Sequence, residues 1–485
     1  INPVRANKRA VIMNEFENKD IEKKRPLVES ALSTLPFTPH ADQMRLLEKL
    51  SDFVETGEPN GVFVLNGYAG TGKTSMVGAF IKALRACRRK VVVVAPTGRA
   101  AKVAQSFSGH PASTIHKLLY RGNSADPGNT TFFLARNTTP DTVFIVDEAS
   151  MISDAPDASG RSLLFHLARY VYSCPGCKMV LVGDEAQLPP VGQSGSTAMH
   201  PERLRGMGLS PVTHSLDLPV RQAAMSGIIH NATFLRQKLF YPDSDAPDAL
   251  FIKDFPDVEA ISSEDLAESL ATSHAEVGED ETLIITRSNK RANDFNRSIR
   301  NIVMYAEEPL ERGDRVVISK NDYYWAKQND MDGFIANGET AEVTWVGKTE
   351  KAYGRYFTDV ELRFVSDGRI MGAKAMLRSL VCEGPAIPRA EMERFYTRVM
   401  DAYEGELSKK IKGALEDPYY NALQMKYAYC VTCHKAQGGQ WKHVYIDMGG
   451  IAPEAMTGDF YRWLYTAVTR ATQKVFFINP TMKLM

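Results

Sequence analysis

Residues 61–74 read GVFVLNGYAGTGKT, an apolar run followed by a glycine-rich turn and a lysine–threonine pair. The last eight residues fit the spacing G-x-x-x-x-G-K-[ST]. Gly67, Gly70 and Gly72 let the backbone wrap a phosphate with its N–H groups pointing inward, and a helix that begins near Lys73 adds its partial positive charge. Because strand, turn and helix follow in this order, we predict a nucleoside triphosphate site rather than a plain glycine-rich turn.

Two acids end another apolar run, VFIVDEAS at residues 143–150. They would lie at the carboxyl edge of the same sheet, where parallel α/β sheets bind ligands. Asp147 can hold Mg²⁺ together with the hydroxyl of Thr74, and Glu148 can orient or deprotonate an attacking water. Gln187 can sense the γ-phosphate through its amide, although a polar loop stopped by two prolines is the alternative interpretation there.

Apolar runs of strand type alternate with amphipathic helical stretches along most of the chain. Short, continuous, β-branched runs fit buried parallel strands, and helices fit between them. The expected strands are Gly61–Leu65, Lys90–Ala95, Thr142–Val146, Lys178–Val182, Thr282–Thr286, His443–Asp447 and Lys474–Ile478. The alternation predicts an α/β fold with parallel sheets.

Two stretches depart from this alternation. Residues 120–141 contain turn residues around a short apolar run and predict a hairpin. Residues 310–381 show the alternating pattern of half-buried strands and predict a small β-barrel-like insertion, whose aromatic cluster Tyr323–Trp325 is expected in its core rather than on DNA. Residues 390–422 look like charged helices that return to the α/β frame.

The composition is that of an ordinary globular protein with several domains. The chain has 485 residues, of which 44% are hydrophobic and 24% charged, and it contains neither an apolar run able to span a bilayer nor a signal peptide. Lysine plus arginine and aspartate plus glutamate both number 58, so the formal net charge is zero. Bulk charge therefore does not favour nucleic-acid binding, and basic residues would have to line a local groove.

Six cysteines are too few for a disulfide scaffold in a chain of this length. The pairs Cys174/Cys177 and Cys430/Cys433 have C-x-x-C spacing, but the gap between the pairs is far longer than that of a zinc ribbon. The second pair runs into His434 and matches a haem-attachment pattern, which requires export. We prefer the interpretation that these cysteines belong to a buried strand and a turn.

Further motifs follow in a fixed order. They are 95–101 (APTGRAA), 113–117 (STIHK), 147–151 (DEASM), 183–190 (GDEAQLPP), 220–222 (VRQ), 432–438 (TCHKAQG) and 465–471 (YTAVTRA). Together with the loop at 67–74, they resemble the superfamily 1 helicases, in the branch that contains RecD and the phage Dda helicase. Pif-type helicases share the early motifs, and no motif can be assigned to residues 378–425.

The resemblance implies two RecA-like motor domains with ATP in the cleft between them. The expected division is a flexible leader at 1–27, a first motor domain at 28–225 with an inserted hairpin, or pin, at 118–141, a second motor domain at 226–309 and 423–485, and an SH3-like β insertion with helices at 310–422. Glutamine, arginine and glycine at matching positions imply the nucleotide contacts. These are Gln43 on adenine, Gly67, Ala69, Gly70, Thr71, Gly72, Lys73 and Thr74 on the phosphates, Asp147 on Mg²⁺, and Arg221 and Arg470 on the γ-phosphate, with an exposed ion pair as the alternative for either arginine.

The resemblance also implies residues that line a single-strand channel and a hairpin that splits the duplex. The channel residues are Thr97, His116, Thr432, His434 and Lys435, whose hydroxyl, imidazole and ammonium groups suit phosphate contacts. On the hairpin, Phe132 and Phe133 either abut the terminal base pair or form a core pair, since stacking of a base on an aromatic ring stabilises binding by only ~1–3 kcal/mol.

The expected activity is therefore ATP-dependent unwinding of DNA, with Mg²⁺ as cofactor and movement on single-stranded DNA, in the 5′→3′ direction by resemblance alone. A translocase that displaces proteins without strong unwinding, and a P-loop switch or kinase, are the alternatives. The expected partners are single-stranded DNA and fork junctions, with single-strand-binding or replisome proteins as candidates and no membrane. We expect a monomer in the cytoplasm of a bacterial or phage-infected cell.

Overall fold

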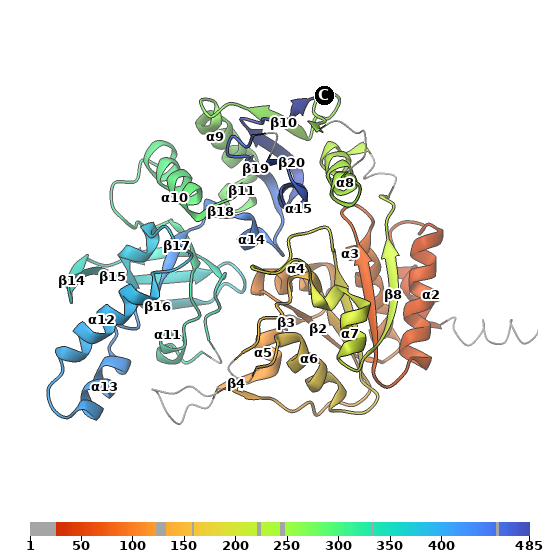
Figure 1. The fold of residues 1–485 in the computed structure, drawn as a ribbon, viewed down its shortest axis with the longest axis horizontal. Coiled ribbons are helices and arrows are strands. Elements are labelled where there is room, and N and C mark those ends of the chain that lie inside the picture. The colour runs from red at the N-terminus through yellow and green to blue at the C-terminus, as the bar shows by residue number, and fades with distance from the viewer. Residues whose placement is uncertain are drawn as a thin grey trace, which may run out of the picture.

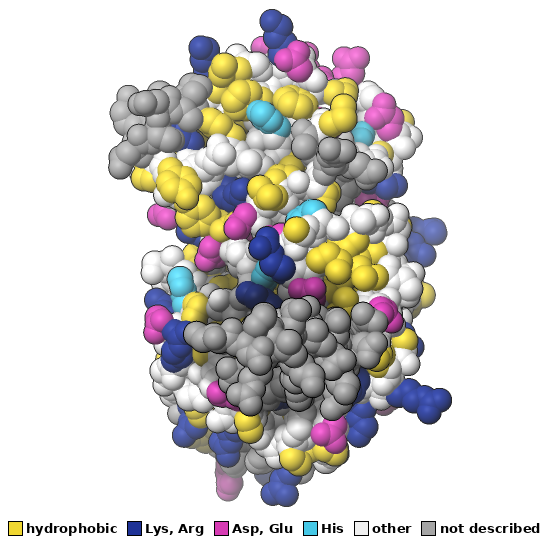
Figure 2. All heavy atoms as spheres, turned by 90° about the vertical axis from the view of Figure 1, so that its right-hand side faces the viewer, with side chains coloured by type: hydrophobic (Ala, Val, Ile, Leu, Met, Phe, Trp, Pro, Cys, Tyr) yellow, Lys and Arg dark blue, Asp and Glu magenta, His cyan; other side chains and the backbone are white. Residues whose placement is uncertain are grey.

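The computed structural model describes residues 26–122, 132–157, 160–220, 225–242, 248–331, 334–452 and 455–485. Three sheets dominate the structure (Figure 1): a parallel sheet drawn in red to yellow, a second parallel sheet in green to dark blue, and a sheet in teal to blue beside them. Acidic and basic side chains are interspersed over the face that Figure 2 shows, in keeping with a net charge of zero. Within these residues no helix is both long and apolar enough to cross a membrane.

The first parallel sheet carries the predicted phosphate loop. Its strands lie in the order β3 (Ala112–Thr114), β2 (Lys90–Ala95), β6 (Thr142–Val146), β7 (Lys178–Gly183), β1 (Gly61–Gly67) and β8 (Ser210–Leu216). Its helices are α2 (Ala41–Thr56), α3 (Lys73–Ala86), α4 (Gly98–Ser108), α5 (Ile115–Leu119), α6 (Leu163–Tyr172) and α7 (Pro201–Gly206). Phe63 and Leu65 of β1 pack with α2 and α3, whereas Val62 and Val64 pack on the other face with α6. Because both faces are buried, the strand is apolar from Val62 to Leu65 and becomes polar at Asn66, where it ends in the loop.

The second parallel sheet is assembled from two distant parts of the chain. Its strands lie in the order β10 (Val258–Ile261), β20 (Ala471–Ile478), β19 (Trp441–Asp447), β11 (Thr282–Thr286) and β18 (Cys430–Thr432). Its helices are α8 (Gly227–Phe240), α9 (Leu266–Val277), α10 (Asn289–Ser298), α14 (Cys433–Ala436) and α15 (Gly458–Val468). A short parallel pair, β9 (Ala249–Leu250) and β21 (Lys483–Leu484), lies outside this sheet.

The stretch between those two parts forms an antiparallel sheet. Its strands are β12 (Arg315–Ile318), β13 (Thr340–Val346), β14 (Glu350–Ala352), β15 (Arg355–Phe364), β16 (Ile370–Met376) and β17 (Met425–Tyr427). Helices α11 (Tyr324–Gln328), α12 (Arg389–Asp401) and α13 (Leu407–Glu416) accompany it. Trp325 packs against the core of this sheet and donates its indole N–H to the carbonyl of Asn421 at 2.9 Å. The boundary at 422 stays a prediction, although β17 pairs within this sheet.

A hairpin projects from the first sheet at the lower edge in Figure 1. Strand β4 (Tyr120–Gly122) pairs antiparallel with β5 (Phe132–Leu134). The residues between the two strands, 123–131, lie outside the described part of the chain. The prediction of an α/β fold built on parallel sheets is confirmed.

Candidate active site

The loop between β1 and α3 has the shape that a phosphate cradle requires. Gly70 and Gly72 have positive φ angles of 75° and 79°, which favour glycine. A Cβ on Gly67 would lie 2.9 Å from the side chain of Lys73, so that position has no room for another residue. The hydroxyl of Thr71 donates to the carbonyl of Tyr68 at 2.8 Å and closes the turn.

Acidic residues follow β6 and β7 at the edge of the sheet where this loop lies. Lys73 donates from Nζ to the carbonyl of Gly183 at 3.2 Å, which brings the ammonium group to the end of β7. Burial and the neighbouring Glu148 carboxylate raise the pKa of Asp147 to about 7, while Lys73 opposes the rise. Burial also raises the pKa of Asp184.

The charge at this edge fits a divalent cation. Asp147 and Glu148 are adjacent carboxylates, and Oε2 of Glu148 is buried with no hydrogen-bond partner among the residues the structure describes. Lys73 is the cation that offsets Asp147. Carboxylate and hydroxyl oxygens suit Mg²⁺, so Asp147 and the exposed Thr74 can hold that ion with a nucleotide.

Gln43 is fully buried beside the loop. Its amide Nε2 donates to the carbonyl of Thr71 at 3.0 Å, and its Oε1 accepts from the backbone N–H of His40 at 3.2 Å. The side chain therefore ties α2 to the phosphate loop. Its predicted contact with adenine stays a prediction.

Helix α15 of the second sheet reaches into this edge of the first. The hydroxyl of Tyr465 donates to Oδ2 of Asp184 at 2.6 Å and accepts from the backbone N–H of Ala69 at 3.0 Å. The next residue of the helix makes a further contact, since the hydroxyl of Thr466 accepts from the backbone N–H of Leu188 at 2.8 Å. Tyr465 is 1% exposed, so these bonds are made without competition from water.

The segment after β7 is held from two further places in the second part of the chain. Arg462 of α15 donates to the carbonyls of Glu185 and Gln187, the latter at 3.1 Å. Gln437 donates from Nε2 to the carbonyl of Leu188 at 2.7 Å. Gln187 is buried, and its Oε1 has no hydrogen-bond partner within the described ranges. Its amide oxygen is therefore available to a hydrogen-bond donor, such as a water molecule, that enters here.

The arginines predicted on the γ-phosphate have different outcomes. Arg221 lies outside the described residues. Arg470 is 3% exposed and donates to the carbonyls of Thr466 and Gly439, at 3.1 and 3.2 Å, and to the hydroxyl of Thr469 at 3.1 Å. These acceptors all belong to the second part of the chain, so Arg470 is turned toward its own sheet in this arrangement, and its catalytic role stays a prediction.

A different arginine faces the phosphate loop. The guanidinium carbon of Arg236, in α8, lies 4.2 Å from the centre of the Tyr68 ring, and Phe240 of the same helix packs edge-on against that ring. The hydroxyl of Tyr68 donates to Oε1 of Glu185 at 2.9 Å. The position of Tyr68 in the loop motif is variable in the pattern G-x-x-x-x-G-K-[ST], so the motif itself could not single out this contact.

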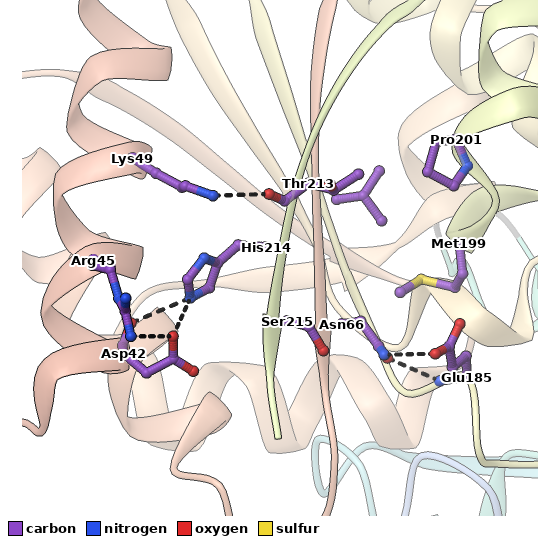
Figure 3. A pocket seen from close by; sticks show the side chains of 11 residues that line it. Asp42, Arg45, Lys49, Asn66, Glu185, Met199, Pro201, Thr213, His214 and Ser215 are labelled. Carbon is purple, nitrogen blue, oxygen red and sulfur yellow. Dashed lines mark hydrogen bonds and ion pairs between the residues drawn. The ribbon is translucent and has the colours of Figure 1, made fainter. Parts of the chain in front are cut away.

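A cavity of about 510 Å³ lies next to Glu185, between α2, β8 and the end of β1 (Figure 3). Asn66 and Glu185 bond to each other twice, at 3.0 and 3.1 Å. On the other side of β8, His214 lies 3.7 Å from the carboxylate of Asp42, and Lys49 donates to the carbonyl of Thr213 at 3.4 Å. The polar groups of this cavity thus pair mainly with one another.

The residues predicted on DNA lie partly along a second contact between the two parallel sheets. Thr97 caps α4 by accepting from the backbone N–H of Ala100 at 3.2 Å, and its hydroxyl would lie 3.3 Å from a Cβ on Gly438. The guanidinium group of Arg99 lies 3.7 Å above the ring of Trp441. Thr97 therefore lies where the motifs around 97 and 438 meet.

The remaining predicted DNA contacts lie on short helices. Thr432 precedes α14, which contains the exposed His434 and the half-buried Lys435. Burial and the nearby Lys426 lower the pKa of Lys435 to about 8. His116 lies in α5, and burial lowers the pKa of its ring.

The hairpin residues can be placed only by their backbone. Phe132 pairs with Gly122 and Phe133 with Arg121, while the side chains of both phenylalanines lie outside the description. Of the cysteines, Cys430 ends up in β18 and Cys433 in α14, both buried. Among the described residues no group of three or more His, Cys, Asp or Glu side chains could hold a metal ion.

Comparison with known families covers both parts of the site. A family described as an AAA domain matches residues 41–233, and a family described as a UvrD-like helicase C-terminal domain matches residues 427–478. The first match contains the phosphate loop and the acids, and the second contains Lys435, Tyr465 and Arg470.

Individual proteins give the same picture. The ATP-dependent RecD2 DNA helicase of Deinococcus radiodurans is 31% identical over 42% of this chain and 27% of that protein. The ATP-dependent DNA helicase dda of Enterobacteria phage T4 is 33% identical over 28% of this chain and 29% of that protein. The matched region thus spans less than a third of either helicase. An uncharacterized protein of Acanthamoeba polyphaga mimivirus is 22% identical over 90% of this chain and 99% of its own length.

Among solved structures, the fold is similar to a Pif1 helicase from Bacteroides in complex with ADP-AlF3 and ssDNA. The TM-score is 0.47 with 14% sequence identity, over 92% of this chain and 94% of that chain.

Proposed function

We propose that this chain, which belongs to the superfamily 1 helicases of the RecD, Dda and Pif1 type, hydrolyses ATP to move along single-stranded DNA and unwind duplex DNA. One observation carries the proposal. Tyr465, from the second sheet, bonds both to the phosphate loop at Ala69 and to Asp184 at the end of β7. A nucleotide that enters this loop must change that contact, so occupancy of the site alters how the two sheets meet.

The hydrolytic step follows from the groups at the edge of the first sheet. A water oxygen attacks the γ-phosphorus, the bond from that phosphorus to the β,γ-bridging oxygen breaks, and ADP and phosphate form. Glu148 orients the water and accepts its proton, which the phosphate or solvent then receives. Lys73 offsets the charge of the β- and γ-phosphates. Mg²⁺, held by Asp147 and Thr74 with the nucleotide, would neutralise the charge that develops on the phosphate oxygens.

The coupling to movement rests on the segment after β7. Gln187 has a free amide oxygen among the described atoms, and its carbonyl is held by Arg462. The amide oxygen of Gln187 is an acceptor, so it would sense the γ-phosphate through the attacking water. A change at Gln187 would then reach α15 through the bond from Arg462, and loss of phosphate would release it. A two-state contact of this kind converts a chemical step into a rearrangement of domains.

The DNA strand would cross both sheets where Thr97 and Lys435 lie. A phosphate near Lys435 would further favour the charged form, which burial and Lys426 disfavour. The hairpin β4–β5 would meet the duplex ahead of the strand, and we propose movement in the 5′→3′ direction, as the resemblance implies. Strand displacement from substrates with either a 5′ or a 3′ tail tests the direction.

The central test is Lys73→Ala. Loss of the ammonium group should abolish ATP hydrolysis that depends on single-stranded DNA, while Lys290→Ala, at an exposed lysine of α10, should leave it unchanged. Steady-state phosphate release with and without an oligonucleotide measures both. If the parent protein hydrolyses ATP equally fast without DNA, the motor function is wrong, and a P-loop switch or kinase becomes the better account.

A translocase without unwinding is the second candidate, because the hairpin β4–β5 is a two-stranded element separate from the sheet that carries the phosphate loop and the acids. Deletion of residues 122–138 separates the two. A helicase that uses the hairpin should lose strand displacement but keep ATP hydrolysis stimulated by single-stranded DNA. Unchanged strand displacement would remove the hairpin from the mechanism.

A further inference from the structure

A basic cavity lies at the opposite edge of the first sheet from the nucleotide site. It has a volume of about 440 Å³ and lies where β2 and β6 begin. Its lining includes Arg85, Arg88, Arg89, Lys90, His110 and Thr142. Strand β2 has six residues, and at ~3.3 Å per residue it places this cavity roughly 20 Å from the edge that carries the acids. We call it the basal cavity; it is separate from the site described above.

The charge of the basal cavity is not neutralised by the protein. Arg85, Arg88, Arg89 and Lys90 are all exposed, and none of them forms an ion pair with a carboxylate within the described ranges. Arg85 donates to the carbonyl of Gly109 at 3.2 Å and Lys90 to the carbonyl of Pro140 at 3.3 Å, which leaves most of their N–H groups free for another acceptor.

The acidic residue next to the cavity in the sequence does not neutralise the positive charge of the basal cavity. Asp141 directly precedes Thr142, but its carboxylate is turned toward Gly176, where it would lie 2.0 Å from an added Cβ. A helix end explains only part of the cluster. Arg85 lies in the last turn of α3, where a cation stabilises the helix by ~0.3–1 kcal/mol. Arg85 alone is enough to stabilise the helix end. Arg88, Arg89 and Lys90 add no such benefit and repel one another.

The hydroxyl groups of the basal cavity are already used. Thr142 donates to the carbonyl of Thr139 at 3.0 Å, and Thr139 donates to Oδ1 of Asn137 at 2.9 Å. His110 bonds through Nε2 to the carbonyl of Val91 at 3.1 Å. Recognition must therefore come mainly from the guanidinium and ammonium groups, which read the charge of a ligand and not its detailed shape. This favours a repeated anion such as a phosphodiester backbone.

The position of the basal cavity indicates which nucleic acid reaches it. Thr139 follows the last residue of β5, Leu134, by five positions, and at ~3.3–3.6 Å per residue the cavity begins within about 18 Å of the paired hairpin strands. A duplex carries one phosphate charge per ~1.7 Å of its axis, so a duplex that meets the hairpin has phosphates within that range.

We infer that the basal cavity binds the phosphodiester backbone of duplex DNA at the fork, on the side of the hairpin away from the single-strand channel. This inference rests on the proposed function. It gives the protein a second contact with its substrate, one that holds the unopened duplex while the motor acts on the single strand. It also explains how a chain with zero net charge presents a concentrated positive site to DNA.

The test compares a forked duplex with its single strand alone. The triple variant Arg85→Gln, Arg88→Gln, Arg89→Gln removes three exposed charges. The matched control Lys290→Gln, Arg297→Gln, Arg312→Gln removes three exposed charges from α10 and from the turn before β12. Dissociation constants are measured over a range of salt. Each lost phosphate contact should reduce the slope of log K against log salt by ~0.9 for a duplex. If each arginine contacts one phosphate, we expect the fork slope to become shallower by ~2.7 and fork affinity at low salt to fall at least about tenfold.

Single-strand affinity and DNA-stimulated ATP hydrolysis should not change in the triple variant. A fork slope equal to that of the parent would overturn the inference, and so would an equal loss for the single strand alone, because the cluster would then belong to the general channel. Failure of the proposed function is distinct, since the parent protein itself would then show no stimulation by DNA. Arg89→Glu, a single exposed change, provides the same comparison if the triple variant does not fold.

Discussion

Removal of one hydroxyl group, in Tyr465→Phe, tests whether the two sheets are coupled through the nucleotide site. The hydroxyl of Tyr465 makes two bonds across the sheets, one to the Asp184 carboxylate at 2.6 Å and one from the N–H of Ala69 at 3.0 Å. Phenylalanine keeps the ring and its packing. The change therefore removes the polar contact with little loss of apolar burial.

The magnitude follows from the character of the two bonds. A hydrogen bond to a charged group contributes ~1.5–3 kcal/mol, and a buried N–H left without a partner costs ~1–3 kcal/mol. The two losses share one hydroxyl group and are not additive. We therefore expect the contact between the two sheets to be weakened by about 2–3 kcal/mol, which lowers the equilibrium constant for forming that contact roughly 30- to 150-fold. The phosphate loop itself remains intact, since Gln43 and Thr71 hold it independently.

The assay is steady-state ATP hydrolysis at saturating single-stranded DNA, with nucleotide affinity measured separately. Loss of coupling predicts a kcat at least tenfold lower, with a nucleotide affinity equal to or higher than that of the parent, since the N–H of Ala69 no longer has to leave Tyr465 to bind a phosphate. Tyr461→Phe is the matched control, because the hydroxyl of Tyr461, on the same helix, donates to Asp248 away from the loop.

A double-mutant cycle with Asp184→Asn separates coupling from simple loss of stability. The effects of the two single variants on the free energy of unfolding and on kcat, both expressed as free energies, are summed and compared with the effect of the double variant. If the two groups act together, the sum should differ from the double variant by more than ~1 kcal/mol. If Tyr465→Phe has the kcat of the parent and its effects add to those of Asp184→Asn within ~0.5 kcal/mol, the coupling through this contact is refuted.

Three further outcomes are expected. The pKa of Asp147 rises from 3.8 to about 7 on folding, so between these values the folded state binds a proton that the unfolded state lacks. The free energy of unfolding should therefore fall as pH rises across that window. Asp147→Asn should flatten this fall, as measured by urea titrations at pH 5 and 7.5. Arg236→Gln removes a cation–π contact with Tyr68 that stabilises by ~0.5–2 kcal/mol, so the kcat of ATP hydrolysis should fall several-fold. Recovery of kcat in Arg236→Lys would support a charge effect, whereas an unchanged kcat in Arg236→Gln would contradict the role of this contact. Asp314→Ala leaves the buried guanidinium of Arg300 unpaired and should lower the free energy of unfolding by roughly 3–5 kcal/mol in chemical denaturation, whereas the exposed Asp367→Ala should lower it by under ~1 kcal/mol.

The strands of the fold were predictable wherever burial on both faces makes a continuous apolar run. Lys90–Ala95, Thr142–Val146 and Thr282–Thr286 have the predicted bounds. Strand β8 was not predicted, because its sequence SPVTHSL mixes polar and apolar residues at the edge of the sheet, where one side of the strand has no neighbour. Strand β3 has three half-buried residues, which is too short for any period to appear.

The nucleotide loop was predictable because its glycines lie where the backbone needs positive φ angles, as at Gly70 and Gly72. The contacts across the two sheets were not, since Arg462 and Arg236 are ordinary helix residues when only the sequence is known, and Tyr465 lies in the motif at 465–471 with no role that the motif assigns to it. Their partners lie hundreds of positions away, and no spacing rule links them. For Gln43 the opposite holds. Its place beside the phosphate loop was predictable from the resemblance, whereas its hydrogen bonds to the backbone of Thr71 and His40 were not.

The residues that join the sheets also suggest how DNA and nucleotide communicate. Leu188, in the segment after β7, donates its N–H to Thr466 on the side of the nucleotide site and accepts at its carbonyl from Gln437. Gln437 follows α14, which carries the predicted DNA contact Lys435. A shift of this one peptide segment by the γ-phosphate would therefore reach both α15 and α14. Both bonds are shorter than 3 Å and buried, so a shift of the segment would change at least one of them, and we predict that ATP and the strand act on the same element.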